Sequence, residues 1–498
     1  MHDSSPRERT QPARPSAWQT GEDRGYQHGL SARQIQMIAI GGAIGTGLFM
    51  GAGGALRTAG PSIIITYIVC GIAAYAILRA LGELVVYRPA SGSFVSYARE
   101  FFGEKAAYAS GWLYWMNWVM TAVVDVTAVA LYMDFFGTYS VVFAAIPQWA
   151  YTLIALLLVT VLNLVSVKLF GEMEFWFSVI KVGTLVAFLV VGIWMVIFGT
   201  PVEGQQVGFS LITDNGGIFP TGLLPGLIAV QGVIFAYAAI ELIGTTAGET
   251  KDARKLIPRA VNTVLLRIGV FYVGSLVLLC LLLPFTAYKA DESPFVTFFA
   301  STGIEGTDII MNLVVLTAAM SSLNAGMYST GRILRSMAMA GSAPAFASRM
   351  TNQGVPYGGI LITSAVSLLG VVLNALVPEQ AFLIVLNLAS VGIIGSWAMI
   401  VMCQMKLVWL ARRGLAQRPN YQLPGGLVTG WVVLGFLALV LVLMAFDNPI
   451  GTWTIVATVV LLVPLMIWGW YGCRGRVAQL AALREQQGSS DLPLVDSH

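Results

Sequence analysis

Twelve long apolar stretches limit most strongly how this chain can fold. A helix needs about 20 mainly apolar residues to cross a hydrocarbon core of about 30 Å. Only 11% of the 498 residues are charged and 57% are hydrophobic, which is far from the composition of soluble proteins. Inside lipid every backbone polar group must find a partner within the protein, which favours helices. We therefore predict an all-α integral membrane protein whose twelve transmembrane helices lie near 33–55, 61–82, 106–133, 149–167, 173–198, 222–248, 262–284, 307–331, 358–377, 381–405, 428–446 and 452–471.

Lysine and arginine residues predict the orientation. If the N-terminus is cytoplasmic, one set of loops receives nearly all of them, and the opposite loops hold only Arg57 and Lys289. By the positive-inside rule, both termini are then cytoplasmic. We expect a multi-pass protein of the cell (inner) membrane. The polar segment 1–30 has no apolar signal region and is predicted to be a disordered cytoplasmic tail, and 477–498 is predicted to be a second tail.

A glycine-rich run interrupts the first apolar segment. Four glycines occupy seven positions between Gly41 and Gly47, and each weakens a helix by about 1 kcal/mol relative to alanine. One interpretation is an unwound helix that offers backbone groups to a bound solute. The other is a close contact between helices through small residues.

A second polar break lies in the sixth segment, between Phe235 and Thr246. Segments one and six are five helices apart, as expected of two five-helix inverted repeats that each begin with a discontinuous helix. We predict a ten-helix transport core over 31–405, followed by helices eleven and twelve in 406–476. This organisation indicates a secondary transporter with a site near the membrane midplane.

Several motifs resemble a known superfamily. Gly45-Thr46-Gly47-Leu48-Phe49, followed by Ala59-Gly60-Pro61, resembles the first-helix signature of the amino acid/polyamine/organocation transporters. The runs 247–252 and 257–260 resemble its amino acid permease branch. Blocks at 78–84, 91–101 and 336–344 are similar to bacterial L-asparagine permeases, and the resemblance covers about 28–475. Glycine/alanine, proline and aromatic permeases share most of these blocks, so those substrates stay open.

The resemblance implies a leucine-transporter-type fold and a set of substrate-binding positions. In this fold, free N–H groups of the first helix hold the substrate carboxylate, and carbonyls of both broken helices hold its amine, which agrees with the charge at helix ends. The implied positions are Thr46, Gly47 and Leu48 for the carboxylate, and Ala43, Ile44, Phe235 and Ala238 for the amine. Phe235 would also cover the substrate, although ordinary apolar packing is an alternative. We expect helix three to offer a carboxamide the polar partners Asn117, Thr121 and Asp125.

Ionisable residues at bilayer depth are costly and are functional candidates. Lys181 lies about nine residues into its segment, or about 14 Å deep. In proton-coupled relatives, the resemblance implies that such a lysine replaces a sodium ion and contacts hydroxyls of helix eight, here Ser321 and Ser322. Glu241 matches a proton-sensing or substrate-linked glutamate of the sixth helix, and a structural hydrogen bond is its alternative. Asp125 either helps to gate the pathway or accepts bonds from neighbouring hydroxyls.

Three charged residues near the cytoplasmic ends are candidates for an inner gate, namely Glu83, Glu249 and Arg259. We predict that the two glutamates pair with Arg79, Lys251 or Arg259.

The sequence lacks the motifs that mark several other classes of protein. The three histidines lie in the tails, and the sequence has no P-loop, no HExxH motif and no GxSxG motif with triad partners. We therefore predict no enzymatic activity, no cofactor, no metal and no nucleic-acid partner. The favoured function is import of an amino acid with protons by alternating access, with L-asparagine as the favoured substrate. A receptor or channel for amino acids is the alternative, although the charged rings or filter motif typical of channels are absent.

Overall fold

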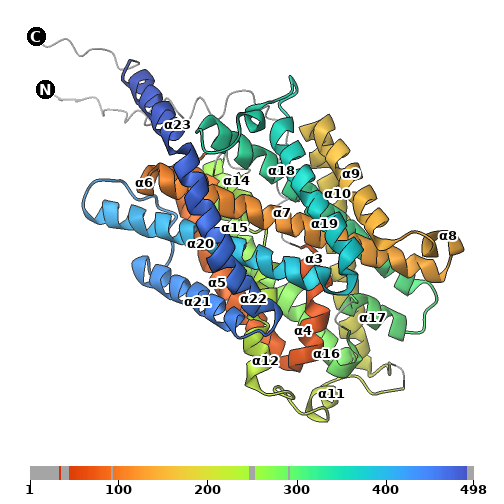
Figure 1. Cartoon of the computed structure of the whole chain (residues 1–498). Coiled ribbons are helices and arrows are strands. Elements are labelled where there is room, and N and C mark those ends of the chain that lie inside the picture. The colour runs from red at the N-terminus through yellow and green to blue at the C-terminus, as the bar shows by residue number, and fades with distance from the viewer. Residues whose placement is uncertain are drawn as a thin grey trace, which may run out of the picture.

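The computed structural model describes residues 33–34, 37, 44–90, 93–202, 204–245, 253–289 and 292–490, and this part of the chain is almost entirely helical (Figure 1). Its one β-type contact is an isolated bridge between Val202 and Gln205. The helices of the membrane-spanning layer are α3 (Thr46–Phe49), α4 (Gly51–Ala59), α5 (Ile63–Tyr87), α7 (Glu104–Phe135), α9 (Gln148–Val165), α10 (Val167–Phe198), α12 (Leu223–Ile228), α13 (Val230–Ala236), α14 (Leu242–Thr245), α15 (Ala253–Arg267), the π-helix η4 (Ile268–Gly274), α16 (Ser275–Leu282), α18 (Thr307–Met339), α19 (Tyr357–Leu376), α20 (Pro378–Arg412), α21 (Leu427–Ala445), α22 (Ile450–Ala457), the π-helix η7 (Thr458–Leu462) and α23 (Val463–Ser490).

Shorter helices connect these elements at the two ends of the bundle. They are η1 (Gly60–Ser62), α6 (Ser93–Phe102), η2 (Phe136–Thr138), α8 (Val141–Ala144), α11 (Ser210–Thr213), η5 (Phe285–Ala287), α17 (Pro294–Ser301) and η6 (Ala345–Ser348).

Ten helices in the described part of the chain are long and apolar enough to cross a membrane. The first, Thr46–Tyr87, joins two of the predicted segments through the short turn at η1. The predicted sixth segment is divided, and its apolar part, Leu223–Ala236, is shorter than a full span. The all-helical membrane fold is therefore confirmed, and the count of twelve stays a prediction.

The helix ends follow local sequence signals. Ser166 precedes α10, and its hydroxyl accepts a hydrogen bond from the backbone N–H of Leu169 at 3.1 Å. The same helix ends at Gly199, whose φ of 64° lies in the left-handed region that glycine adopts without strain. These two signals leave 32 residues of continuous helix between them.

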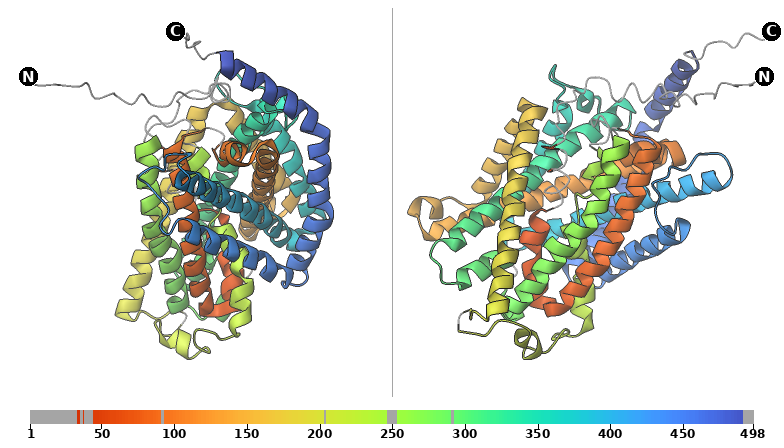
Figure 2. Two further views of the ribbon diagram at one scale, coloured as in Figure 1. Left: turned by 90° about the vertical axis from the view of Figure 1, so that its left-hand side faces the viewer. Right: turned by 180° about the vertical axis from the view of Figure 1, so that it is seen from behind.

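The long helices lie side by side (Figure 2). Their contacts follow a regular pairing. Helix α3 contacts α13, α5 contacts α15, α7 contacts α18, and α9 contacts α19. Counted as transmembrane segments, these pairs are one with six, two with seven, three with eight and four with nine. Contacts between neighbours also recur, because α7 packs on α9 as α18 packs on α19. An inverted repeat of five helices is expected to give this pattern.

Basic side chains of α23 contact the start of α7 and the end of α18, which the sequence places on the same side of the membrane. Arg484 in α23 pairs with Glu104 at the start of α7, with 3.2 Å between nitrogen and oxygen. Arg476 donates a hydrogen bond to the carbonyl of Gly341, just beyond α18, at 2.7 Å. Because α23 continues to Ser490, much of the segment that we predicted as a C-terminal tail is helical.

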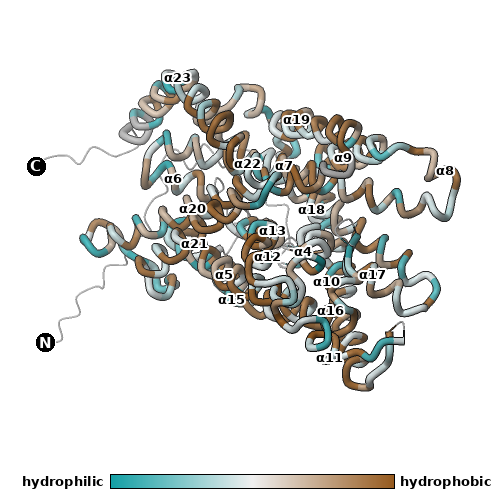
Figure 3. Tube along the Cα trace, turned by 60° about the horizontal axis from the view of Figure 1, so that its bottom comes forward, coloured by the Kyte–Doolittle hydropathy of each residue, from teal (hydrophilic) through white to brown (hydrophobic). Residues whose placement is uncertain are grey.

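Hydrophobic residues, brown in Figure 3, also lie along the outer helices of the bundle. Large exposed hydrophobic residues occur along α10, α21 and α23, for example Trp194, Trp431 and Trp468. In a soluble protein such a surface would mark an interaction site, whereas here it is the surface expected to face lipid.

Candidate functional site

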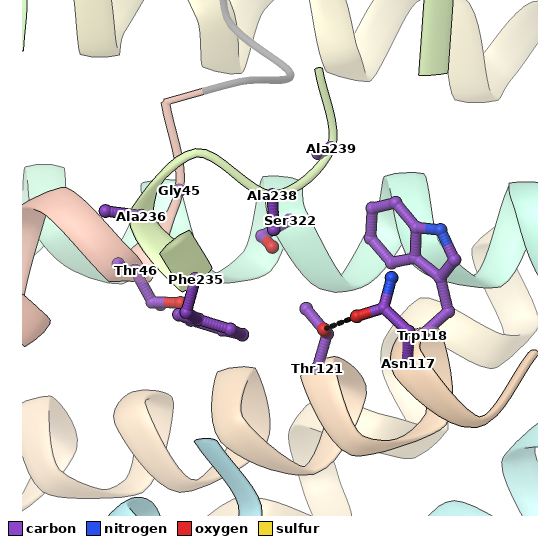
Figure 4. Close-up of a pocket in the computed structure, with 11 residues that line it drawn as sticks. Gly45, Thr46, Asn117, Trp118, Thr121, Phe235, Ala236, Ala238, Ala239 and Ser322 are labelled. Carbon is purple, nitrogen blue, oxygen red and sulfur yellow. Dashed lines mark hydrogen bonds between the residues drawn. The ribbon is translucent and has the colours of Figure 1, made fainter. Parts of the chain in front are cut away.

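A small cavity lies where the two broken segments meet two long helices (Figure 4). Its volume of about 20 Å³ has room for about one water molecule. The segment around α3, the end of α13 with the turn after it, α7 and α18 all contribute to its wall. The lining residues are Gly45, Thr46, Gly47, Asn117, Trp118, Thr121, Phe235, Ala236, Ala238, Ala239 and Ser322.

The break in the sixth segment is confirmed. Helix α13 ends at Ala236, Ala239 has a φ of 70°, and helical structure resumes at Leu242. Two tyrosines hold the turn. Tyr272 donates a hydrogen bond to the carbonyl of Ala236 at 3.1 Å, and the ring of Tyr237 stacks on that of Tyr272 with 4.9 Å between centroids. The backbone at bilayer depth is thus buried in protein, as its polar groups require.

The first segment approaches this turn very closely at Gly47. A Cβ atom at this position would lie 2.5 Å from the Cα atom of Ala236. Only glycine permits such an approach between two backbones. The described residues begin again at Ile44, so the glycines Gly41 and Gly42 and the candidate Ala43 lie outside the described residues.

Helices α7 and α18 complete the wall because small residues let them come close. The ring of Trp118 packs directly on Gly326 of α18. A Cβ atom added to Gly326 would lie only 2.7 Å from this ring. The Cβ atom of Asn117 is 2.8 Å from the corresponding position on Gly392 of α20. The hydroxyl of Thr121 donates to the side-chain oxygen of Asn117 at 3.3 Å, so two polar side chains face the cavity together (Figure 4).

Six of the ten substrate-binding candidates line the cavity, namely Thr46, Gly47, Asn117, Thr121, Phe235 and Ala238. Ile44 and Leu48 are buried beside it without lining it. Asp125 is also buried outside the wall, and its carboxylate accepts a hydrogen bond from the Thr46 hydroxyl at 2.8 Å. This contact links helix three to the broken first segment. The binding roles of all ten stay predictions.

Lys181 lies fourteen residues after the start of α10, or about 21 Å along it. Its side chain is fully buried, and its ammonium donates a hydrogen bond to the Ser321 hydroxyl at 2.8 Å. The predicted contact with helix eight is thus present. Glu174, which sequence reasoning missed, lies 3.9 Å from the same ammonium. Its spacing of seven residues from Lys181, two helical turns, was the signal that could have revealed it.

Ser322 of α18 carries the second hydroxyl that we predict near Lys181. Its side chain lines the cavity.

Glu241 is the last residue of the turn, and only about 1% of its surface is exposed. Its carboxylate accepts a hydrogen bond from the indole N–H of Trp397 in α20 at 3.2 Å. The glutamate therefore ties the broken sixth segment to α20. This contact accounts for a structural role and leaves a proton-sensing role as a prediction.

The predicted pairing of Glu83 is wrong. This fully buried carboxylate in α5 accepts hydrogen bonds from Arg418 at 2.5 and 3.1 Å, from Gln404 at 3.0 Å and from the backbone N–H of Leu423 at 2.7 Å. The reason is that the loop between α20 and α21 folds back over the end of α5 and supplies the arginine.

Arg79, one of the partners that we predict for Glu83, has other contacts. It donates to Asn262 at 3.0 Å and to the carbonyl of Gln422, and its guanidinium lies over the ring of Tyr421. Arg259 is exposed in α15, and Glu249 and Lys251 lie outside the described residues.

Comparison with known proteins identifies the family. The amino acid permease family model matches residues 34–479. The chain belongs to the amino acid permease family. It is therefore a membrane transporter of amino acids and not an enzyme. It is 58% identical to the L-asparagine permease of Salmonella typhimurium and 57% identical to that of Escherichia coli, over 93% of this chain and 92% of each relative. It is also 57% identical to L-asparagine permease 1 of Mycobacterium tuberculosis, over 94% of both chains.

Proposed function

We propose that this permease imports L-asparagine together with protons by alternating access. The observation that carries the proposal is the cavity in which the two broken segments meet Asn117 and Thr121 of α7. The first N–H groups of α3 have no partner within that helix, so they can hold a carboxylate. The side chains of Asn117 and Thr121 offer a donor and acceptors to a carboxamide. The names of three relatives that are 57–58% identical favour the same substrate.

Alternating access would move the broken segments against the helices around them. The Lys181–Ser321 contact joins α10 to α18 near the middle of the membrane. A lysine there can occupy the place of a coupling cation, and its protonation would then set which arrangement of the helices is stable. The clustering of basic loops favours a cytoplasmic location of both termini in the inner membrane.

Competition in proteoliposomes tests the substrate. Uptake of labelled L-asparagine is measured with excess unlabelled L-asparagine, glycine, L-alanine, L-proline or L-phenylalanine. We expect unlabelled L-asparagine to compete best, because the other side chains cannot pair with Asn117 and Thr121. Stronger competition by proline or phenylalanine, without competition by L-asparagine, would contradict the assignment.

Replacing Lys181 with alanine should reduce pH-gradient-driven uptake about tenfold or more, since a hydrogen bond from a charged group is worth about 1.5–3 kcal/mol. Exchange of substrate in the absence of a gradient should be less affected. Both rates are measured in the same proteoliposomes. Undiminished uptake driven by a pH gradient in the variant, or strict sodium dependence of the wild type, would overturn this mechanism.

Replacing Glu241 with glutamine should leave folding intact and change the pH profile of uptake. The glutamine oxygen can still accept the bond from Trp397, whereas the titrating group is gone. Uptake is compared between acidic and neutral pH, with Trp397→Phe as the variant that removes the donor and keeps the carboxylate. A wild-type pH profile in Glu241→Gln would leave Glu241 with a structural role alone.

A further inference from the structure

Three fully buried side chains form a directed chain of hydrogen bonds between α10 and α18. The Lys181 ammonium donates to the Ser321 hydroxyl at 2.8 Å. The same hydroxyl donates to the Glu174 carboxylate at 2.6 Å, and the direct distance from the Lys181 nitrogen to that carboxylate oxygen is 3.9 Å. Each donor thus points toward the carboxylate, with the serine between the two charged groups.

The arrangement follows from helix geometry. Lys181 and Glu174 are seven residues apart, so both face α18 from one side of α10. Ser321 and Asn324 are three residues apart on α18 and face back. The amide of Asn324 lies 3.5 Å from the second carboxylate oxygen of Glu174, and its own oxygen accepts a hydrogen bond from Asn163 of α9 at 2.8 Å.

The charges around this chain are few and buried. The uncharged groups that bond to Glu174 are the Ser321 hydroxyl and the Asn324 amide, both on α18. Two carboxylates interact electrostatically with Lys181, namely Glu174 on its own helix and Asp125 on α7. Asp125 in turn accepts the hydrogen bond from Thr46, which lines the cavity. Hydrogen bonds therefore connect Lys181 to Glu174, and an electrostatic interaction with Asp125 relates Lys181 to the wall of the substrate cavity.

We propose that Glu174 is the proton acceptor for Lys181 and that Ser321 relays the proton. In this step an N–H bond of the ammonium breaks and the serine oxygen takes that proton. The serine's original proton passes to the Glu174 carboxylate, where a new O–H bond forms. The products are a neutral amine and a neutral carboxylic acid, so no proton is gained or lost. Lys181 could then change its charge without water entering the middle of the protein.

Burial makes such a transfer physically reasonable. An ion pair taken out of water keeps a large desolvation penalty, which a neutral pair does not have. The inference rests on the proton coupling proposed above and adds Glu174 and Ser321 as the route that the proton takes. The competing explanation is a purely structural ion pair that holds α10 against α18.

Glu174→Gln tests the acceptor, and Glu172→Gln is its matched control. Glu172 lies two residues away on the same helix, but it is partly exposed and pairs with Arg33 at 2.8 Å. In proteoliposomes, Glu174→Gln should lower the initial rate of L-asparagine uptake driven by a pH gradient about tenfold. This factor corresponds to the smallest energy expected for the loss of a hydrogen bond to a charged group, about 1.5 kcal/mol. Its exchange of labelled for unlabelled L-asparagine without a gradient should stay close to wild type. Glu172→Gln should resemble wild type in both assays.

Ser321→Ala tests the relay with both charged groups retained. Its control is Ser178→Ala, because Ser178 is buried on α10 between Glu174 and Lys181 and its hydroxyl has no hydrogen-bond partner among the described residues. Ser321→Ala should lose gradient-driven uptake selectively, and Ser178→Ala should not. This pair also decides the matter if Glu174→Gln does not fold.

The outcomes separate the two proposals. Wild-type uptake that ignores the pH gradient would overturn proton coupling and the relay with it. A wild type that responds to the gradient, together with undiminished coupling in Glu174→Gln or Ser321→Ala, would overturn the relay alone. Equal loss of uptake and exchange in folded Glu174→Gln protein would show the structural ion pair instead.

Discussion

Replacing Gly47 with alanine is expected to abolish uptake in a protein that still inserts into the membrane. The added Cβ would lie 2.5 Å from the Cα atom and 2.9 Å from the nitrogen of Ala236. These are backbone atoms, which cannot rotate away as a side chain can. The first segment and α13 must therefore separate, and the cavity between them would lose its shape. Overpacking of this kind costs about 1–3 kcal/mol, and here the strain falls entirely on the binding site.

Gly51→Ala is the matched control for this prediction. Gly51 begins α4, four residues along the same segment, and no heavy atom outside its chain neighbours and its own helix backbone lies within 4 Å of the position of an added Cβ. This variant should transport at a rate close to wild type. Initial uptake of labelled L-asparagine is measured per amount of reconstituted protein, after size-exclusion chromatography has shown that both variants fold. Normal uptake in Gly47→Ala would mean that the close approach is not needed for binding.

The breaks were predictable because they depend on local sequence. Glycine weakens a helix wherever it stands, so the run that ends at Gly47 marked the first segment in advance. The polar sequence after Phe235 marked the second, and the structure confirms a turn there. The depth of a residue in the membrane was also predictable, because it follows from the position of that residue within its apolar segment. Lys181 was recognised for this reason, and the structure places it near the middle of α10.

The partners of the buried charges were not predictable from sequence. Glu83 bonds to Arg418, which is 335 positions away, and Glu241 bonds to Trp397, which is 156 positions away. Such contacts depend on how helices pack, which no local pattern encodes. The sequence favours Arg79 as the partner of Glu83 because the two residues lie one turn apart on α5. The loop after α20 supplied a better partner. Glu174 differs from these cases, since its spacing from Lys181 was visible in the sequence.

Loss of the Arg418 side chain should be among the most destabilising single changes in this protein. Glu83 is fully buried, and Arg418 is its charged partner through two hydrogen bonds. Removing one member of a buried ion pair costs about 3–5 kcal/mol, because the other charge stays buried without compensation. Gln404 and the N–H of Leu423 still bond to Glu83, and the Arg418 side chain is 21% exposed. We therefore expect Arg418→Ala to lower the free energy of unfolding by about 3 kcal/mol, the lower end of this range.

A second substitution gives this prediction its sharpest form. If the cost comes from the uncompensated charge, adding Glu83→Gln to Arg418→Ala should raise the melting temperature again. Arg413→Ala is the control, since Arg413 is exposed close by and its guanidinium lies over the ring of Trp409. That variant should melt close to wild type. Melting temperatures of the four purified proteins in one detergent decide the matter. A double variant that melts below Arg418→Ala would show that Glu83 is stabilised by its other hydrogen bonds and that the arginine does not determine the fold of this end of α5.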